Sequence, residues 1–386
     1  MKIIYSQFSL ANWMFILLLT ACNGQINVEP TATMPPSFTN TPTQRPTETT
    51  TATATVNPTE MIIPQPGTLV FSSCSTFCDI FIINNDGSGL TKLTTSDMFY
   101  IFYLQWSPDG TKIVFSALEK TSDCTGDSPN PSNQKDGCNF DIFTINADGS
   151  QLLNLTNYQG EDSYPEWSPD GKKIVFNSDR SGNHEIYSIN ADGTGLKRLT
   201  NNSIVAIYPE WSPDGSSIAY TTARRKSNGD PYFEICVMNS DGTEIKEIIE
   251  GDILDWSPDG TYIAFTSYTG SIIDLFIIKP DGTGLVNLTN SNAFEYGLSW
   301  SPDGKYITYV TGRDDNTEIY TVCVDCDNDQ PVNITNSELM EQNPSWSPDG
   351  TQIAFQSGDG LCVMNSDGSQ KKCFNKQSAG SIDWKP

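Results

Sequence analysis

Short apolar runs alternate with turn-forming residues along most of the chain, most clearly in SYPEWSPDGKKIVFNSDRSGNHEIYSINADGTGLKRLT at 163–200. The runs are rich in Ile, Val, Phe and Tyr and are bounded by Gly, Pro, Asn and Asp, which is typical of β-strands. We therefore expect four strands, A to D, joined as an antiparallel meander. Their expected ranges are Tyr164–Trp167, Lys173–Ser178, Glu185–Asn190 and Leu196–Thr200.

This pattern recurs at a nearly fixed interval. The pentapeptide WSPDG begins at residues 106, 167, 211, 256, 300 and 346, and all but the first interval are 44 to 46 residues. Such a period is typical of β-propeller blades, which bury their apolar faces only against neighbouring blades. Strand B occurs seven times, but its first copy at Thr68 has no strand A before it. Ser381–Trp384 has the sequence of a strand A and is expected to complete that first blade.

The pentapeptide itself is expected to have a structural role. In Ser-Pro-Asp-Gly, Pro presets the backbone of a type I turn, Asp suits the third position and Gly adopts the left-handed conformation that closes the hairpin. A second Asp-Gly turn follows strand C in each copy, as in NADGTG at 190–195. Each WSPDG is therefore interpreted as the A-to-B turn of one blade, with its Trp packed between blades.

These repeats resemble the propeller of the TolB family and its relatives, including the propellers of the dipeptidyl peptidase IV and prolyl oligopeptidase families. The resemblance rests on the Trp-Ser-Pro-Asp-Gly turn, the Ile-Tyr pair of strand C and the Leu-Thr end of strand D. It implies an all-β propeller fold. The seven copies of strand B predict a seven-bladed β-propeller of four-stranded antiparallel blades over 67–386, closed by a C-terminal strand that completes the N-terminal blade. TolB resembles a six-bladed propeller, so the expected blade number departs from it.

The first 66 residues have a different character. Residues 1–21 are expected to form a lipoprotein signal peptide, since an apolar run precedes LTAC at Leu19–Cys22, which resembles a lipobox. Cys22 is then the lipidated residue of a protein anchored to a bacterial membrane outside the cytoplasm. An ordinary secretory peptide is the alternative. Residues 22–66 are rich in Thr and Pro and are expected to form a disordered tether.

Charge limits the kinds of partner. The chain has 47 acidic and 22 basic side chains, a formal net charge of -25, which opposes binding to nucleic acid and indicates a monomer kept apart by self-repulsion. No cofactor is expected. A hydrolase is disfavoured because His184, expected to be a solvated rim residue, is the only histidine and no G-x-S-x-G elbow occurs. Asp325, Asp327 and Asp329 alternate like calcium ligands but lack the Gly and Glu of such a loop, so they are only a weak metal candidate.

Nine cysteines remain besides Cys22, and an exported protein can oxidise them. Four disulfides are candidates: Cys74–Cys78, Cys124–Cys138, Cys323–Cys326 and Cys362–Cys373. The last pair occupies the positions of Tyr187 and Arg198, which the hairpin register places opposite each other. Cys236 is left over and is expected to be a buried free thiol.

The remaining variation indicates where a partner would bind. Both repeated turns lie on one face of a propeller, so the variable B-to-C and D-to-A connections lie on the other, where recognition usually occurs. The candidate binding residues there are Tyr100, Tyr158, Arg224, Arg225, Lys226, Phe294 and Tyr296. The favoured function is a non-enzymatic binding or scaffold module for a protein or cell-wall partner, and the resemblance to TolB implies an association with the cell envelope. The alternatives are a receptor for a small ligand or metal ion at the central channel and, less favoured, a hydrolase.

Overall fold

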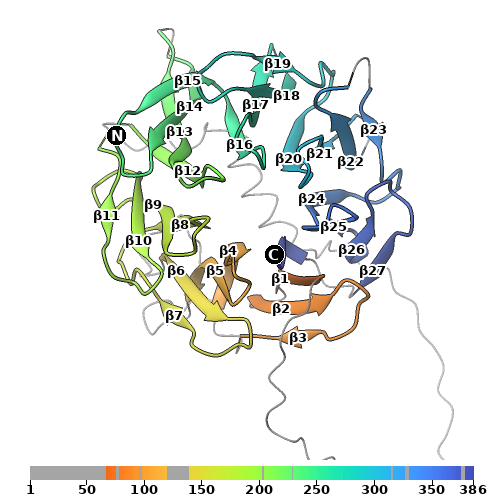
Figure 1. Ribbon diagram of the computed structural model, residues 1–386, viewed down its shortest axis with the longest axis horizontal. Helices are drawn as coiled ribbons and strands as arrows, with labels where there is room; N and C mark the ends of the chain where they lie inside the picture. The colour runs from red at the N-terminus through yellow and green to blue at the C-terminus, as the bar shows by residue number, and fades with distance from the viewer. Residues whose placement is uncertain are drawn as a thin grey trace, which may run out of the picture.

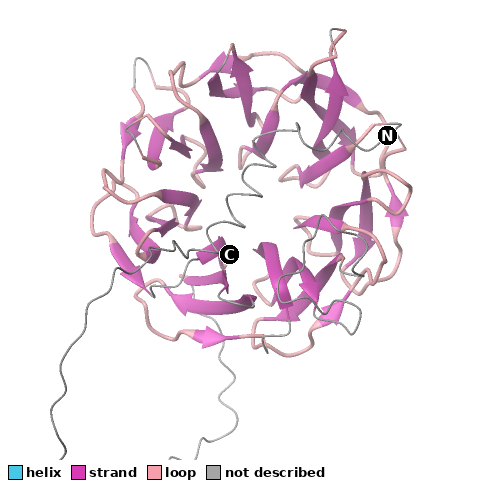
Figure 2. Cartoon of the chain, turned by 180° about the vertical axis from the view of Figure 1, so that it is seen from behind, coloured by secondary structure: helices cyan, strands magenta, loops and turns pink. Residues whose placement is uncertain are grey.

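Seven blades of four β-strands each are arranged around a central axis in the computed structural model (Figure 1). The structure describes residues 67–74, 78–94, 98–119, 139–201, 204–227, 229–270, 272–313, 316–326, 330–374 and 379–386. Strands and loops make up these residues, as the view from behind shows (Figure 2). The predicted seven-bladed β-propeller is thus confirmed. None of the described residues forms a helix with the length and apolar character needed to cross a bilayer.

Each blade has the four expected strands, from the innermost, A, to the outermost, D. The A strands are β28 (Ala379–Trp384), β4 (Met98–Trp106), β8 (Asp162–Trp167), β12 (Ala206–Trp211), β16 (Asp252–Trp256), β20 (Glu295–Trp300) and β24 (Glu341–Trp346). The B strands are β1 (Thr68–Cys74), β5 (Lys112–Glu119), β9 (Lys173–Ser178), β13 (Ser217–Arg225), β17 (Ile263–Thr269), β21 (Tyr306–Thr311) and β25 (Gln352–Ser357). The C strands are β2 (Cys78–Asn84), β6 (Phe140–Asn146), β10 (Glu185–Asn190), β14 (Pro231–Asn239), β18 (Ile272–Ile278), β22 (Glu318–Cys323) and β26 (Gly360–Asn365). The D strands are β3 (Thr91–Lys92), β7 (Leu153–Asn154), β11 (Lys197–Arg198), β15 (Lys246–Glu250), β19 (Val286–Asn287), β23 (Val332–Asn333) and β27 (Lys372–Phe374).

The ring closes as the sequence predicts. β28 pairs antiparallel with β1, with Leu69 opposite Trp384 and Phe71 opposite Ile382, so the last strand is the innermost strand of the first blade. A single pairing between Cys78 and Met98 also joins the first two blades into one sheet. Neighbouring A strands contact one another around the axis.

The A strands are longer than the sequence suggested. A β-bulge interrupts the pairing of strands A and B, as between Ser163 and Glu166 in the third blade. Pairing resumes beyond the bulge, so the apolar residues expected in D-to-A loops are partly strand residues instead: Tyr100 lies in β4 and Tyr296 in β20. The prediction was wrong here because a bulge lets a strand continue past a residue that breaks the regular alternation.

Apolar side chains fill the space between adjacent blades. In one core cluster, Val175 and Ile186 of the third blade pack with Trp211 and Tyr220 of the fourth. The tryptophans of the pentapeptides lie in such clusters and are largely buried. Cys236 belongs to the same cluster, and the prediction that it is a buried free thiol is confirmed. No blade therefore has a complete core without its neighbours.

The WSPDG turns have the expected geometry. Gly215 has a φ of 70°, the left-handed region that favours glycine, and its N–H donates to the carbonyl oxygen of Ser212 at 2.8 Å. The Ser212 hydroxyl donates to Asp214 at 2.6 Å and accepts the N–H of Ser217 at 2.9 Å. A Cβ on Gly215 would lie 3.8 Å from Pro169 Cδ of the preceding turn, so the turns form a ring. The A-to-B and C-to-D turns together form what we call the turn face, and the B-to-C and D-to-A connections form the loop face.

Both ends of the described propeller lie at the turn face. The carbonyl oxygen of Gly67 accepts the N–H of Asn85, in the C-to-D turn of the first blade, at 2.9 Å. Lys385 donates its N–H to Thr68 at 2.8 Å. Because β1 runs from the turn face to the loop face, the chain enters the propeller on the side away from the loop face.

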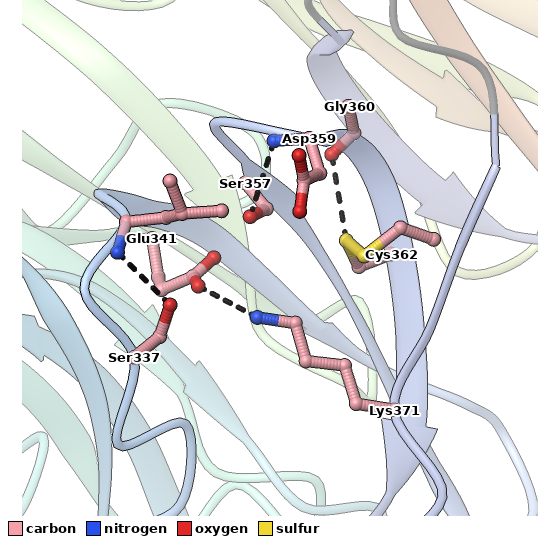
Figure 3. Close-up of a disulfide and its surroundings, with 9 residues drawn as sticks. Ser337, Glu341, Ser357, Asp359, Gly360, Cys362 and Lys371 are labelled. Atoms are coloured by element: carbon pink, nitrogen blue, oxygen red, sulfur yellow. Dashed lines mark hydrogen bonds and ion pairs between the residues drawn. A yellow bond between two sulfur atoms is a disulfide. The ribbon is translucent and has the colours of Figure 1, made fainter.

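Three of the four candidate disulfides lie within the described residues, and the structure contains all three: Cys74–Cys78, Cys323–Cys326 and Cys362–Cys373. Figure 3 shows the surroundings of Cys362, whose disulfide with Cys373 joins β26 to β27. In the same blade, fully buried Glu341 forms an ion pair with Lys371, with 2.8 Å between Oε1 and Nζ. Cys124 and Cys138 lie outside the described residues.

Candidate ligand site at the propeller axis

Two positions of each A strand face the axis. In β8 the half-buried Tyr164 and Glu166 alternate with the buried Ser163, Pro165 and Trp167. These two positions lie three and one residues before each blade's tryptophan, and we call them the outer and inner axial positions. The outer position is nearer the loop face, because strand A runs from a D-to-A connection to a WSPDG turn.

Side chains at the inner axial positions link one blade to the next. The backbone N–H of Trp106 donates to Asp383 at 2.7 Å, that of Trp167 to Gln105 at 3.0 Å and that of Trp211 to Glu166 at 2.6 Å. The N–H groups of Trp256 and Trp300 donate in the same way to Glu210 and Asp255. The free edge of each A strand faces the axis, so these acceptor groups lie beside it. In the sixth and seventh blades the inner positions are the short Ser299 and Ser345.

Burial raises the pKa of every carboxyl group at an inner axial position. It raises the pKa of Asp255 and of Asp383 to about 7 each. The pKa of Glu166 and that of Glu210 are raised well above the usual range, first by burial and then by the neighbouring carboxylates, including Asp255. The carboxylates thus converge closely enough to oppose one another's ionisation.

Three tyrosines occupy the outer axial positions of the second, third and fourth blades. The ring centroids of Tyr103 and Tyr164 are 3.9 Å apart, and those of Tyr164 and Tyr208 are 4.3 Å apart. The Tyr164 and Tyr208 hydroxyls are 3.4 Å apart. Tyr103 is 44% exposed, so solvent reaches this cluster. Burial nevertheless raises the pKa of Tyr103 to about 12, and Asp252 in the fifth blade adds to that rise.

The backbone at the outer axial position is unusual. Tyr103, Tyr164 and Tyr208 have φ values of 50°, 56° and 55°, a region that bulky residues seldom adopt. The corresponding Asn343 and Gly297 share this conformation, at 53° and 60°, so the bulge itself imposes it. Non-glycine residues in such conformations cluster at binding and active sites.

Basic side chains expected at the loop face are mostly paired. Arg224 forms ion pairs with Glu234 of β14, at 2.5 Å, and with Glu247 of β15, both in its own blade. Lys226 forms an ion pair with Glu250 at 2.7 Å. Arg225 donates to the carbonyl oxygen of Gly229 at 2.8 Å. The ARRK segment is therefore not a free cationic patch, because strands β14 and β15 of its own blade supply glutamates beside it.

The four aromatic candidates differ in exposure. Phe294 is 45% exposed, whereas Tyr296 is half-buried and packs against the core between the sixth and seventh blades. Tyr100 is half-buried and stacks on Phe102, with ring centroids 6.1 Å apart. Tyr158 lies against Arg180, whose guanidinium carbon is 4.8 Å from the ring centroid. The structure thus brings these aromatics to one face but not to one site.

Other candidates lie elsewhere or outside the described residues. His184 is half-buried rather than solvated, with Nε2 3.9 Å from a carboxylate oxygen of Glu161, the residue before β8. No group of three metal-ligating side chains occurs among the described residues, which include Asp325 but not Asp327 or Asp329. Cys22 also lies outside them.

The axial residues were missed from the sequence although their positions are regular. Alignment on the tryptophans gives Gln, Glu, Glu, Asp, Ser, Ser and Asp one residue before them, and Tyr, Tyr, Tyr, Ile, Gly, Asn and Ser three residues before. The turn sequence is the same in six blades, whereas these two aligned positions have acidic or aromatic residues in some blades only, and comparing them would have revealed the site. The motif drew attention to what is repeated rather than to what differs beside it.

Solved structures share this architecture. TolB from Acinetobacter baumannii is 18% identical with a TM-score of 0.50, over 83% of each chain. An oligogalacturonate lyase from Vibrio parahaemolyticus is 13% identical with a TM-score of 0.55, over 80% of this chain and 86% of the lyase. A puromycin-hydrolyzing peptidase of Mycobacterium tuberculosis is 12% identical with a TM-score of 0.56, over 79% of this chain and 52% of the peptidase. At these identities the likeness shows the fold alone.

Sequence comparisons are more specific. An uncharacterized protein of Agrobacterium fabrum is 27% identical over 103 residues, which cover 27% of this chain and 29% of that relative, less than a third of its length. The TolB beta propeller domain family matches residues 130–252 and 217–372, which together span more than half of the chain. The chain therefore belongs to the TolB β-propeller family.

Proposed function

We propose that the protein is a non-enzymatic binding module, anchored by a lipid on Cys22 outside the cytoplasmic membrane, that engages a protein or cell-wall partner with its loop face. The observation that carries this proposal is the arrangement of the two faces. The described chain enters and ends at the turn face, so a tether attached to Gly67 leaves the loop face and the tyrosine cluster directed away from the anchor.

The two faces also differ in what they offer a partner. The repeated turns contain twelve aspartates whose pKa is lowered by hydrogen bonds within the turn. They are Asp86, Asp109, Asp148, Asp170, Asp192, Asp214, Asp241, Asp259, Asp281, Asp303, Asp349 and Asp367. Such a face repeats the same acidic residue at each of these turns, with Lys172 and Lys305 paired to two of the aspartates. The loop face instead has varied side chains, including exposed Phe294 and Tyr268. Varied, partly aromatic surfaces favour specific interfaces.

Membership of the TolB family supports a place in the cell envelope, by the resemblance rather than by any contact seen in the chain. The lipobox-like LTAC segment and the Thr- and Pro-rich tether support export and anchoring. The lyase and the peptidase share only the propeller fold. The acceptors at the axis favour one alternative, a ligand receptor, and this is developed below as part of the same binding function.

Partner capture tests the proposal. The full-length protein is crosslinked in its native membrane, and its neighbours are identified by mass spectrometry. The loop-face variant has Arg225→Ser, Tyr268→Ser and Phe294→Ser, all at solvent-accessible positions, so that folding is retained. The matched control has Leu196→Ser and Leu285→Ser, which are similarly exposed beside C-to-D turns.

Loss of a captured partner in the loop-face variant, with retention in the control, is the expected result. Equal capture by all three proteins would overturn the loop-face assignment. Labelling with a radioactive fatty acid, present in the wild type and absent from Cys22→Ser, is expected if Cys22 is lipidated. Equal labelling of the two proteins would overturn that part of the proposal.

A further inference from the structure

We propose that the axial site, formed by Tyr103, Tyr164, Tyr208, Glu166 and Glu210, receives a lysine or arginine side chain of the partner protein. This inference rests on the proposed binding function and names the chemistry of the contact. It places the specific recognition element at the axis, rather than in the loop-face residues that the sequence singled out.

The tyrosine cluster is suited to a cation with an apolar stem. Its three rings form a continuous wall across three blades, with adjacent centroids 3.9 and 4.3 Å apart, and Tyr103 is 44% exposed. Aromatic faces attract ammonium and guanidinium groups through the negative potential of the ring. Lysine and arginine side chains also cover apolar surfaces with their methylene groups while the charge lies beyond.

Carboxyl groups lie where that charge would arrive. In the second blade, Phe102 lies opposite Ser116 and Gln105 lies opposite Val114. Ser116 and Val114 are two residues apart in the regular strand β5, so Phe102 and Gln105, on either side of the bulge, are about 7 Å apart along the strand. The outer and inner axial positions are therefore within about 7 Å along the strand. A lysine or arginine side chain is long enough to pass the tyrosines and reach Glu166 or Glu210.

The opposite side of the axis has small residues. The sixth blade has Gly297 and Ser299 at its outer and inner axial positions, and the seventh has Asn343 and Ser345. The tyrosines and longer acceptor groups come from the second to fifth blades, apart from Asp383. The site thus has large aromatic and acidic side chains on one side of the axis and short side chains on the other, so the side opposite the tyrosines carries little bulk.

A cationic side chain fits these residues better than a metal ion. Glu166, Glu210 and Asp255 come from three different blades, and each accepts the N–H of a tryptophan in the next blade. They lie in no group of three metal-ligating side chains within the described part of the chain. Charge attraction over several ångströms does not need inner-sphere geometry, and the net charge of -25 favours approach of a cationic partner.

The protonation of the axial carboxyl groups should make cation binding depend on pH. Glu166 and Glu210 oppose each other's ionisation together with Asp255, and Asp252 faces the tyrosines from the fifth blade. The described groups around this site also include Glu161 near Tyr208, and Asp383 at the first blade. A bound cation stabilises the ionised carboxylates, so binding releases protons and becomes tighter as the pH rises through the raised pKa values of these groups, that of Asp255 being about 7.

The test uses blocked tripeptides as probes with the full-length protein in mild detergent. Acetyl-Gly-Lys-Gly-amide and acetyl-Gly-Arg-Gly-amide are compared with the norleucine peptide, which has the same kind of stem without the charge. Binding is measured by NMR titration at pH 6 and 8 and at low and high salt. We expect at least tenfold tighter binding of the two cationic peptides than of the norleucine peptide.

Three variants locate the contact. Glu166→Gln with Glu210→Gln removes two axial carboxyl groups and is expected to weaken binding at least tenfold. Asp192→Ser with Asp241→Ser removes two carboxylates of the same blades at the turn face and is expected to change binding less than twofold. Asn343→Tyr keeps every carboxyl group but fills the small side of the axis, and its backbone already has the φ that tyrosine adopts in three other blades. It is expected to abolish binding.

Equal affinity for the norleucine peptide, or an equal loss in the axial and turn-face double variants, would overturn the inference. The same variants are also used for crosslinking in the native membrane. If the axial variants still capture the partner and the loop-face variant does not, the cation inference fails and the proposed function stands. If neither set changes capture, the loop-face function fails as well.

Discussion

Two sets of carboxyl groups in the same repeat behave in opposite ways. Asp170 lies four residues after Glu166, at the turn face, where Lys172 and Ser168 hydrogen-bond to it and lower its pKa to about 2. The axial carboxyl groups have a raised pKa because burial disfavours their charge, as for Asp255 and Asp383. The local surroundings, and not the residue type, decide whether an acidic side chain stabilises this fold in its charged form.

The difference separates structure from recognition. The turn aspartate occurs in all six pentapeptides, because each turn needs an acceptor for its serine hydroxyl and a backbone N–H. The axial positions differ from blade to blade although the tryptophan beside them does not. Repeated positions therefore maintain the propeller, and the variable positions next to them are available for a ligand.

The two sets also predict opposite responses to pH. A turn aspartate with a lowered folded-state pKa contributes stability above its unfolded value of about 3.9, and this is lost as the pH falls through the folded value. An axial carboxyl group with a raised pKa contributes stability below about 4, and this is lost as the pH rises from about 4 to 7. Their sum predicts greatest stability in weak acid, between about pH 4 and 6.

The largest effect is expected at a repeated position. Trp211→Ala removes a large buried side chain between two blades and should lower the free energy of unfolding by about 3–5 kcal/mol. Urea unfolding monitored by circular dichroism measures this value. A loss below 1 kcal/mol would contradict the assignment of the tryptophans to the core.

A smaller effect of opposite sign is expected at the axis. Asp255→Asn keeps an acceptor for the N–H of Trp300 but removes a charge that burial disfavours, and should raise the free energy of unfolding at pH 8 by about 1–2 kcal/mol. No gain is expected at pH 4, where the carboxyl group is protonated. Equal gains at both pH values would show that charge is not the cause.

A substitution in the WSPDG turn is expected to lower the free energy of unfolding, by less than the axial substitution raises it. Ser212→Ala removes the hydroxyl that donates to Asp214 and accepts the N–H of Ser217, which should cost about 1 kcal/mol. The pKa of Asp214 should rise toward its ordinary value, because that hydroxyl is the largest cause of its depression. NMR titration of the Asp214 carboxyl group measures the rise, and an unchanged pKa would count against this hydrogen bond.

The smallest change in stability is expected at the tyrosines. Tyr208→Asn loses ring contacts but relieves a positive φ that asparagine tolerates better, as Asn343 does in the seventh blade. The free energy of unfolding should change by less than about 1 kcal/mol, while binding of the cationic peptides weakens severalfold. A large loss of stability would instead make Tyr208 a structural residue.

Much of the fold could be predicted from the sequence. The spacing of the tryptophans, the count of B strands and Trp384 predicted the blade number and the closing strand, because these features depend on local turn chemistry and strand period. The pairing of Cys362 with Cys373 followed from the register of Tyr187 and Arg198, which the structure shows opposite each other.

The site could not be predicted in the same way. The bulge that turns Tyr164 toward the axis depends on pairing with β9, and the link between Glu166 and Trp211 joins residues of different blades. Likewise, the pairing of Arg224 with Glu234 and Glu247 needs the long hairpin and its neighbouring strand. Composition alone made this segment look like a free basic patch.

The closing strand also determines how the propeller resists force. β1 has hydrogen-bonded neighbours on both sides, β2 and β28, and begins at Gly67, where the described chain enters the fold. A pull on Gly67 directed along β1 loads both strand pairs in shear, so their hydrogen bonds share the load instead of opening one after another. We therefore expect the N-terminal blade to resist extension most strongly, so that, with the tether and partner proposed above, a pull on the propeller would not unravel it from its first strand.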